Sequence, residues 1–220
     1  PTSEPSPGPT TAPTPAPTPT PTPAPSTAEP APTRTATLPP SLVVVPTLNP
    51  TLAPIDCPSG NAVSVKFNEI DGVSLNHGDY VTELGYGITV DATGNGFTDN
   101  GPRVYDTSGD FPGNDEDLEV NLGNVLIVQE AKDALPDDNV RGGNIRFYFP
   151  MPVFVRNLVV LDTERSATVI AKSGGRGGTE LLRKQGPSVG DKQTGDIIVN
   201  TGNVDFLRVR FPESGAVLEV

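Results

Sequence analysis

Three apolar, β-branched runs within residues 121–162 limit what this chain can fold into more than any other feature. The runs cover residues 125–128, 145–149 and 153–161, and a polar loop at residues 132–143 separates the first from the second. Apolar runs bounded by Pro, Gly, Asn and Asp are typical of strands joined by turns. This stretch therefore predicts the centre of an all-β domain.

The rest of the chain beyond residue 60 repeats this pattern of short apolar runs and turns. Further strands are expected at residues 63–67, 86–90, 167–171, 179–183, 196–200, 204–211 and 216–220. The glycine-rich residues 174–178 are typical of a hairpin loop. Apolar side chains in residues 204–211 do not keep one parity, which favours a β-bulge or burial on both faces. About nine or ten short strands without an amphipathic helix favour an antiparallel two-sheet β-sandwich, jelly-roll-like in type.

Residues 1–60 differ in composition from everything that follows, because they hold 19 of the 26 prolines. Proline fixes φ and removes a backbone donor, so a polyproline II or disordered segment is expected. Alternating Thr and Pro is also typical of an O-glycosylated, mucin-like stalk, and a bare spacer is the alternative. We therefore expect a stalk or linker over residues 1–60, a β-sandwich domain over residues 61–220, and a secreted or cell-surface location.

The formal net charge of −12 bears on the choice of partners. A surplus of carboxylates repels phosphate backbones, so nucleic acid is not expected to bind. Divalent cations and neutral or cationic polymers suit such a surface better. The longest apolar run is too short to cross a membrane, which takes roughly 18 or more residues, so no membrane span is expected.

The strongest candidate site is the acidic loop at residues 106–119. Its oxygen-rich side chains are Asp106, Asp110, Asn114, Asp115, Glu116, Asp117 and Glu119. Ca²⁺ takes about six to eight oxygen ligands, and a loop rich in Asp and Gly can supply them. The EF-hand spacing is absent. We expect Asp106, Asp115 and Asp117 to be the first ligands, with Asn114 and Asp110 beside them, and a solvated acidic surface is the alternative.

Two further places could bind a ligand. Asp137, Asp138 and Asn139 lie between two central strands and could hold a cation or pair with Arg141, although such residues also cap their own turns. In the strand at residues 145–149, alternation places Tyr148 on the opposite face from its two Phe neighbours. Tyr148 is therefore a candidate for contact with a glycan.

Catalytic residues are harder to find. His77 is the only histidine, and its setting, Asn-His-Gly, is typical of a turn, so neither a Ser-His-Asp triad nor a zinc site is expected. Glu130 and Asp162 each lie at a strand end and could act as an acid and base pair, but their spacing does not single them out. We therefore expect no catalytic site.

Several segments resemble a known kind of domain. GNVLIVQE, PDDN, GGNIRFYF and VRNLVVLDTE, with VYDT upstream, are similar to a β-sandwich domain of secreted bacterial and algal cell-surface proteins. The bacterial versions often precede a sorting helix of the PEP-CTERM kind. The resemblance covers roughly residues 63–220 and implies the fold and a surface location, since these domains largely lack an assigned activity. The Pro/Thr-rich segment and the absence of a sorting helix depart from that pattern.

Three functions remain open on this evidence. The first is a non-catalytic extracellular module for adhesion or for binding a glycan or matrix polymer, stabilised by Ca²⁺. The second is an accessory or catalytic domain of a secreted polysaccharide-active enzyme. The third is a purely structural protein of a wall or matrix.

Overall fold

The computed structural model describes residues 62–70, 72–96, 100–110, 115–131 and 134–220. The stalk or linker expected over residues 1–60 lies outside these ranges and stays a prediction. Asn114, one of the expected Ca²⁺ ligands, also lies outside them.

The described residues form antiparallel strands and two short 3₁₀ helices. In chain order these elements are β1 (Glu69–Ile70), β2 (Val73–Ser74), β3 (Glu83–Leu84), η1 (Gly85–Gly87), β4 (Ile88–Gly94), β5 (Pro102–Asp106), η2 (Glu116–Leu118), β6 (Asn124–Val128), β7 (Gly143–Leu161), β8 (Thr168–Ser173), β9 (Thr179–Gln185), β10 (Thr194–Phe211) and β11 (Ala216–Glu219). The expected all-β class is confirmed, as is the β8–β9 hairpin. In this part of the chain no helix is long and apolar enough to cross a membrane.

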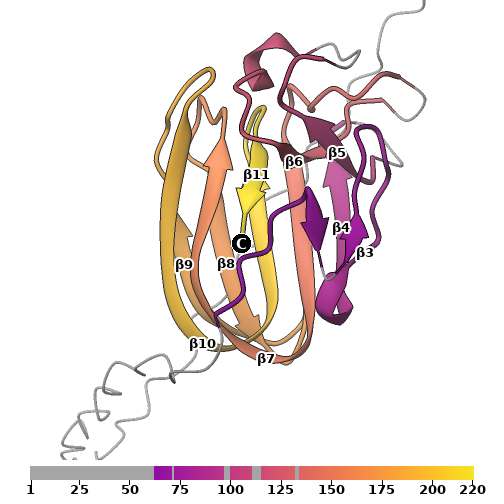
Figure 1. Cartoon of the computed structure of the whole chain (residues 1–220). Helices are drawn as coiled ribbons and strands as arrows, with labels where there is room; N and C mark the ends of the chain where they lie inside the picture. Colours follow the sequence, from indigo (N-terminus) through magenta and orange to yellow (C-terminus); the bar gives the residue numbers. More distant parts are fainter. Residues whose placement is uncertain (1–61, 71, 97–99, 111–114, 132–133) are drawn as a thin grey trace, which may run out of the picture. The chain divides into compact units, whose positions relative to one another are not determined.

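The strands form two layers, and β7 and β10 run through both of them (Figure 1). Layer A has the order β3-β4-β7-β10-β8-β9 and uses residues 143–148 of β7. Layer B has the order β5-β6-β11-β7-β10 and uses residues 158–161 of β7. The sandwich is therefore one continuous hydrogen-bonded sheet folded over on itself.

The sheet bends within β7 and β10. The sequence predicted separate short strands in these places, and that prediction was wrong, because β7 and β10 are 19 and 18 residues long. The register of β7 against β10 passes from Tyr148↔Phe206 directly to Val153↔Val204. The two prolines of β7 lie in this unpaired gap, so they remove no ladder hydrogen bond. On β10, Asn200 and Asn203 have φ values of 46° and 59°, a conformation that Asn tolerates better than most residues. The bulge expected in residues 204–211 is confirmed by the register shift after Val204.

The main core lies between the layers and follows the alternation of the strands. Phe147 and Val209 of layer A and Leu126, Leu158 and Val217 of layer B are at most 1% exposed. Because side chains alternate across a strand, the residues that alternate with these core residues along each strand point to the outer faces.

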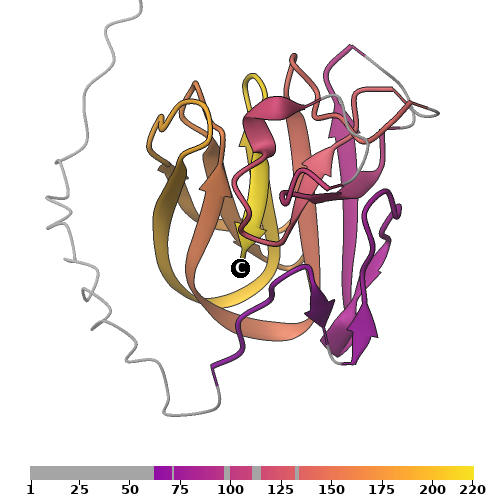
Figure 2. The same ribbon diagram turned by 45° about the horizontal axis from the view of Figure 1, so that its top comes forward.

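A second apolar cluster covers the outer face of layer B. Leu118 of η2 is fully buried and packs against Val125, Ile127 and Leu161. This cover explains why residues 125–128 are apolar without alternation, since that strand is buried on both faces. Figure 2 shows the η2 turn beside β11. The acidic loop is therefore fastened to the sheet by a buried leucine.

Candidate functional site

Seven carboxylates from four loops gather at one end of the sandwich. The inner trio is Asp115, Asp137 and Asp138, and the rim quartet is Asp117, Asp162, Glu164 and Asp191. Within each group, one oxygen of every member lies within 4.8 Å of the others. We call the seven together the loop-end cluster. Residues from different loops, 20 to 76 positions apart in the chain, thus meet in one place, because the turns at the ends of β6, β7 and β9 converge beside η2.

The first residue of the trio, Asp115, is the N-cap that directly precedes η2. The backbone N–H of Asp117 donates to Asp115 Oδ1 at 3.2 Å, and the Tyr105 hydroxyl donates to the Asp115 carbonyl at 2.7 Å. Leu118, one residue further on, is buried in the second core. These contacts fix Asp115 in place at 7% exposure.

Asp138 is held from two sides in the loop between β6 and β7. Gln129 forms an isolated antiparallel bridge with it, and the Gln129 side-chain amide donates to the carbonyls of Ala131 and Leu135 at 3.0 Å. The Gly215 N–H donates to Asp138 Oδ2. Gly215 has a φ of 146°, a value that suits glycine. The carboxyl is therefore fixed at 6% exposure.

Asp162 follows the last residue of β7 in the left-handed region, with φ of 56°. It is 1% exposed, and its Oδ2 accepts a hydrogen bond from the Ser214 hydroxyl at 3.2 Å. Asp162 Oδ1 and Asp115 Oδ2 are buried without any hydrogen-bond partner among the described residues. Buried charged oxygens without partners are costly, so the cluster is electrostatically incomplete as the chain alone builds it.

Burial raises the pKa values of the three buried members of the cluster, because it disfavours the ionised form. Burial, followed by the charge of Asp137, raises the pKa of Asp115. Burial, with the charges of Asp115 and Asp162, raises the pKa of Asp138 well above its usual range. Burial also raises the pKa of Asp162 to about 6. A proton on Asp138 would give Asp115 a donor, and a bound cation would make that proton unnecessary.

The expected Ca²⁺ ligands are distributed unevenly. Asp115 and Asp117 belong to the loop-end cluster. Asp106 and Asp110 do not: Asp106 Oδ1 accepts from the Ser108 N–H at 2.9 Å, and the Asp110 N–H donates to the Ser108 hydroxyl at 3.2 Å. The Asp106 side chain therefore caps its own turn, and the expected set of Ca²⁺ ligands remains a prediction.

The second predicted group also divides. Asp137 and Asp138 belong to the cluster, whereas Asn139 Oδ1 accepts from the Arg141 N–H at 2.9 Å and caps its own turn. Sequence reasoning weighed Asp162 only as an acid or base. It missed Glu164 and Asp191 altogether, although Glu164 follows a predicted strand end.

A second region with functional side chains is the outer face of layer A. The strand registers place its outward side chains in three rows across β4, β7, β10, β8 and β9. The rows are Thr89-Tyr148-Phe206-Lys172-Glu180, Asp91-Arg146-Arg208-Ile170-Arg183 and Thr93-Asn144-Arg210-Thr168-Gln185. We call this surface the arginine face.

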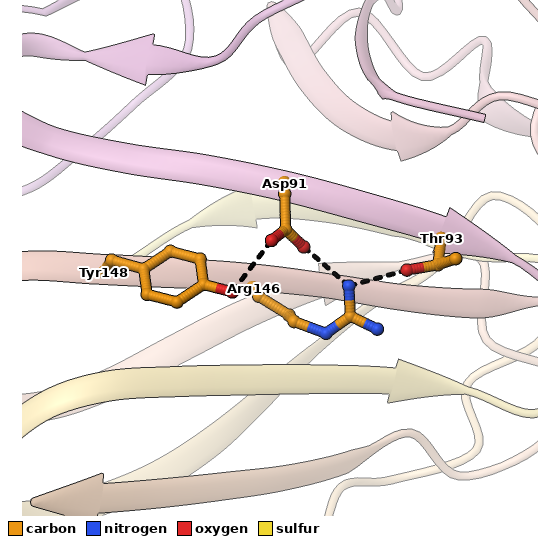
Figure 3. A network of polar contacts seen from close by, with 4 residues as sticks. All are labelled: Asp91, Thr93, Arg146 and Tyr148. Atoms are coloured by element: carbon orange, nitrogen blue, oxygen red, sulfur yellow. Dashed lines mark hydrogen bonds and ion pairs between the residues drawn. The ribbon is translucent and has the colours of Figure 1, made fainter. Parts of the chain in front are cut away.

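Tyr148 is part of a fixed network on this face (Figure 3). Arg146 donates to Asp91 Oδ1 and to the Thr93 hydroxyl, both at 2.6 Å, and the Tyr148 hydroxyl donates to Asp91 Oδ2 at 2.8 Å. The Tyr148 ring meets the Phe206 ring edge to face at 5.2 Å. Tyr148 thus lies opposite the buried Phe147, as alternation predicted, and is half-buried. Its contact with a glycan stays a prediction.

No protein-family model matches the chain, and no curated protein matches it. Among solved structures, the chain is similar to one described as CpGH89CBM32-6 produced by Clostridium perfringens. That match has a TM-score of 0.33 and 10% identity, and it covers 64% of this chain and 94% of that chain. The β-sandwich rests on the strand pairing described above, and the resemblance to PEP-CTERM-type surface proteins stays a prediction.

Proposed function

We propose that this domain is a non-catalytic glycan-binding or adhesion module outside the cell, and that its loop-end cluster holds a Ca²⁺ ion. The observation that carries the Ca²⁺ proposal is the pair of buried carboxylate oxygens without donors, Asp115 Oδ2 and Asp162 Oδ1, in a group of seven acids. A divalent cation would coordinate such oxygens and offset the repulsion between the carboxylates.

The chemistry of the donors favours Ca²⁺ over other metals. All seven side chains offer carboxylate oxygens, whereas Zn²⁺ and Cu²⁺ sites draw on His and Cys. Asp117, Glu164 and Asp191 are exposed and leave the cluster open to solvent, so an ion could enter and keep some water. Asp162 would be the buried anchor of an ion in the rim quartet, and Asp115 and Asp138 would be the buried anchors of an ion in the inner trio. An ion in the quartet would join η2 to the loops after β7 and β9, and one in the trio would join η2 to the loop after β6.

The arginine face supports the ligand-binding part of the proposal. Sugar hydroxyls both donate and accept, and the network of Asp91, Arg146 and Tyr148 presents both kinds of group in a fixed arrangement. Groups that are already ordered lose little entropy when a ligand binds.

One observation favours an enzyme instead. The pKa of Asp162, about 6, lies in the range of a general acid. A glycosidase, however, needs two carboxylates across a cleft that admits substrate. Asp162 is 1% exposed and lines neither of two pockets among the described residues, of about 320 and 640 Å³, whose linings contain no acidic side chain and one, respectively. Burial among other acids accounts for the raised pKa without catalysis.

Calcium titration tests the cation site directly. We expect a saturable calorimetric signal with Ca²⁺. At a concentration about 100 times Kd, bound Ca²⁺ should add about 2.7 kcal/mol to the free energy of unfolding. In a domain of this size that raises Tm by about 5–10 °C relative to the protein in chelator. An unchanged Tm at millimolar Ca²⁺ would remove the cation from the proposal.

Two single substitutions locate the ion. Asp117→Asn removes an exposed acid of the rim quartet and should weaken the binding of Ca²⁺. Asp196→Asn removes an exposed acid of β10 outside the cluster and should leave it unchanged. A glycan array with Ca²⁺ present then tests the ligand: binding to no glycan would contradict the glycan proposal while leaving the cation site standing.

A further inference from the structure

The arginine face is basic although the protein as a whole is acidic. Its three rows contain two acidic residues, Asp91 and Glu180, while the net charge of the chain is −12. The basic residues of the rows are Arg146, Lys172, Arg183, Arg208 and Arg210. A surplus of one sign, confined to one face of a sheet, indicates a partner of the opposite sign.

The two acids of the face are already engaged. Arg146 pairs with Asp91 at 2.6 Å, and Arg183 pairs with Glu180 at 2.7 Å. The remaining arginines, at positions 208 and 210, form no ion pair among the described residues. The face therefore retains guanidinium groups that its own carboxylates do not neutralise.

Arg208 lies in the middle of this surplus. Its Nε is buried and has no hydrogen-bond partner among the described residues. Burial lowers its pKa, and the neighbouring charges of Arg183, Arg146 and Arg210 lower it further, against a smaller opposing effect of Glu180. A buried donor without an acceptor, surrounded by like charges, is the complement of an anion.

A pocket of about 320 Å³ opens at one edge of the face. It is lined by Arg165, Ser166, Thr168, Gln185, Arg210 and Pro212. Three of these are neighbours in the third row, and Arg210 is two residues from Arg208, about 7 Å along the same side of β10. The Arg165 side chain is 70% exposed, and its Nε pairs at 3.0 Å with Oε1 of Glu213, which is not among the residues that line the pocket. The lining thus combines two guanidinium groups, two hydroxyls and an amide without a carboxylate.

We infer that the arginine face binds an acidic polysaccharide, with one carboxylate or sulfate seated between Arg165 and Arg210 and the chain passing Arg208. This inference rests on the proposed function as a glycan-binding module. Arg recognises such groups through paired N–H donors. Ser166, Thr168 and Gln185 offer partners for the uncharged sugar hydroxyls between the acidic groups.

The rest of the molecule favours a polysaccharide over a nucleic acid. Duplex DNA carries one negative charge per about 1.7 Å of its axis. The loop-end cluster adjoins the edge of the pocket, since Glu164 of the cluster directly precedes Arg165 of the lining. A polymer with sparse charges can satisfy the pocket while presenting neutral hydroxyls to those acids.

Three dextrans with one backbone test the inference: unmodified dextran, carboxymethyl-dextran and dextran sulfate. Binding is measured calorimetrically at physiological salt and at saturating Ca²⁺. We expect the double variant Arg165→Gln/Arg210→Gln to bind the preferred anionic dextran about tenfold or more weakly than wild type. Arg156→Gln, which removes an exposed charge of β7 outside the face, should bind within about twofold of wild type. Unchanged Tm values establish that the variants are folded.

The other outcomes are separable. Equal binding of the double variant and wild type to the anionic dextrans overturns the inference. Binding of unmodified dextran that is as tight as that of the anionic dextrans, and that does not depend on Arg165 and Arg210, also overturns it and leaves the proposed function intact. Absence of binding to every glycan on an array overturns the glycan-binding part of the proposed function as well. Single-stranded poly-dT that binds as tightly as the best anionic dextran, with the same loss in the double variant, overturns the polysaccharide in favour of nucleic acid.

Discussion

The loop-end cluster has an excess of negative charge, and the arginine face has an excess of positive charge. In the cluster, Asp115, Asp138 and Asp162 are buried among other acids, and none of the ion pairs found among the described residues includes any of the seven. On the face, both acids are paired, and Arg208 keeps a buried donor without an acceptor. Unbalanced charge in a poorly hydrated site is costly unless something else neutralises it. One region therefore calls for a cation and the other for an anion.

The two regions also differ in what positions them. Strand pairing places the residues of the arginine face at fixed intervals, so the position of each side chain is set by backbone hydrogen bonds. Loops place the residues of the cluster, and those loops are held by the second core and by single side chains. Loss of packing should therefore disturb the cluster more than the face.

A cavity beneath η2 should separate the two regions in this way. Leu118→Ala should lower the free energy of unfolding by about 2–5 kcal/mol, because it leaves a cavity under η2. It should also weaken the binding of Ca²⁺, since Asp115 and Asp117 flank the cavity. Urea unfolding measures the first effect and calorimetry the second. Leu122→Ala, at a residue 48% exposed, is the control and should change stability by less than about 0.5 kcal/mol.

The next effect concerns pH in the absence of divalent cations. The pKa of Asp162 is about 6 in the folded protein and 3.8 for an ordinary Asp. The folded state therefore binds a proton that the unfolded state releases, and stability falls as pH rises through about 6. We expect urea unfolding in chelator to give about 1–3 kcal/mol more stability at pH about 5 than at pH about 7.5.

Calcium should reverse that dependence. The ion needs ionised carboxylates, so its stabilising effect should shrink as the pH is lowered through about 6. Asp162→Asn keeps a residue suited to the φ of 56° and removes the charge. In chelator it should be more stable than wild type at pH about 7.5 and lose much of the pH dependence. A variant less stable than wild type there would show that Asp162 is not under repulsion.

The same substitution on the arginine face should have the opposite sign. Asp91→Asn leaves Arg146, whose side chain is 9% exposed, without its carboxylate. We expect a loss of about 1 kcal/mol, kept small because the Asp91 side chain is 46% exposed. Chemical unfolding of both Asn variants in parallel, in chelator at pH about 7.5, makes the comparison. A stabilising effect of both would erase the difference between the two regions.

Much of the fold followed from local patterns. Alternation in residues 145–149 predicted that Tyr148 faces away from Phe147, and the apolar run at residues 125–128 predicted a strand at the centre of the all-β domain. The continuity of β7 through Pro150 and Pro152 did not follow, because proline is compatible with a strand only where no ladder bond is required. That condition depends on the register of β10.

The sites were less accessible to sequence reasoning for a similar reason. An acidic loop predicts a local surplus of negative charge. The order of the strands in the sheet determines which distant loops converge on it, so no feature of the sequence around Asp191 indicated that this residue belongs to the cluster. Parity predicts that Arg208 and Arg210 share a face. Only the register places Arg146 and Arg183 in the same row as Arg208.

A single change of charge on the arginine face should alter the binding of an anionic dextran without altering stability. Glu180 and Arg183 form an exposed pair, and the hydrogen bond from Arg183 lowers the pKa of Glu180. Exposed pairs contribute little to stability, so Glu180→Gln should leave Tm unchanged. It would nevertheless free Arg183, and we expect it to bind the preferred anionic dextran about twofold more tightly. Asp196→Asn removes the same charge elsewhere and should have no such effect, because screening limits the reach of an exposed charge. Equal gains in both variants would mean that net charge, rather than the arrangement of arginines on this face, determines binding.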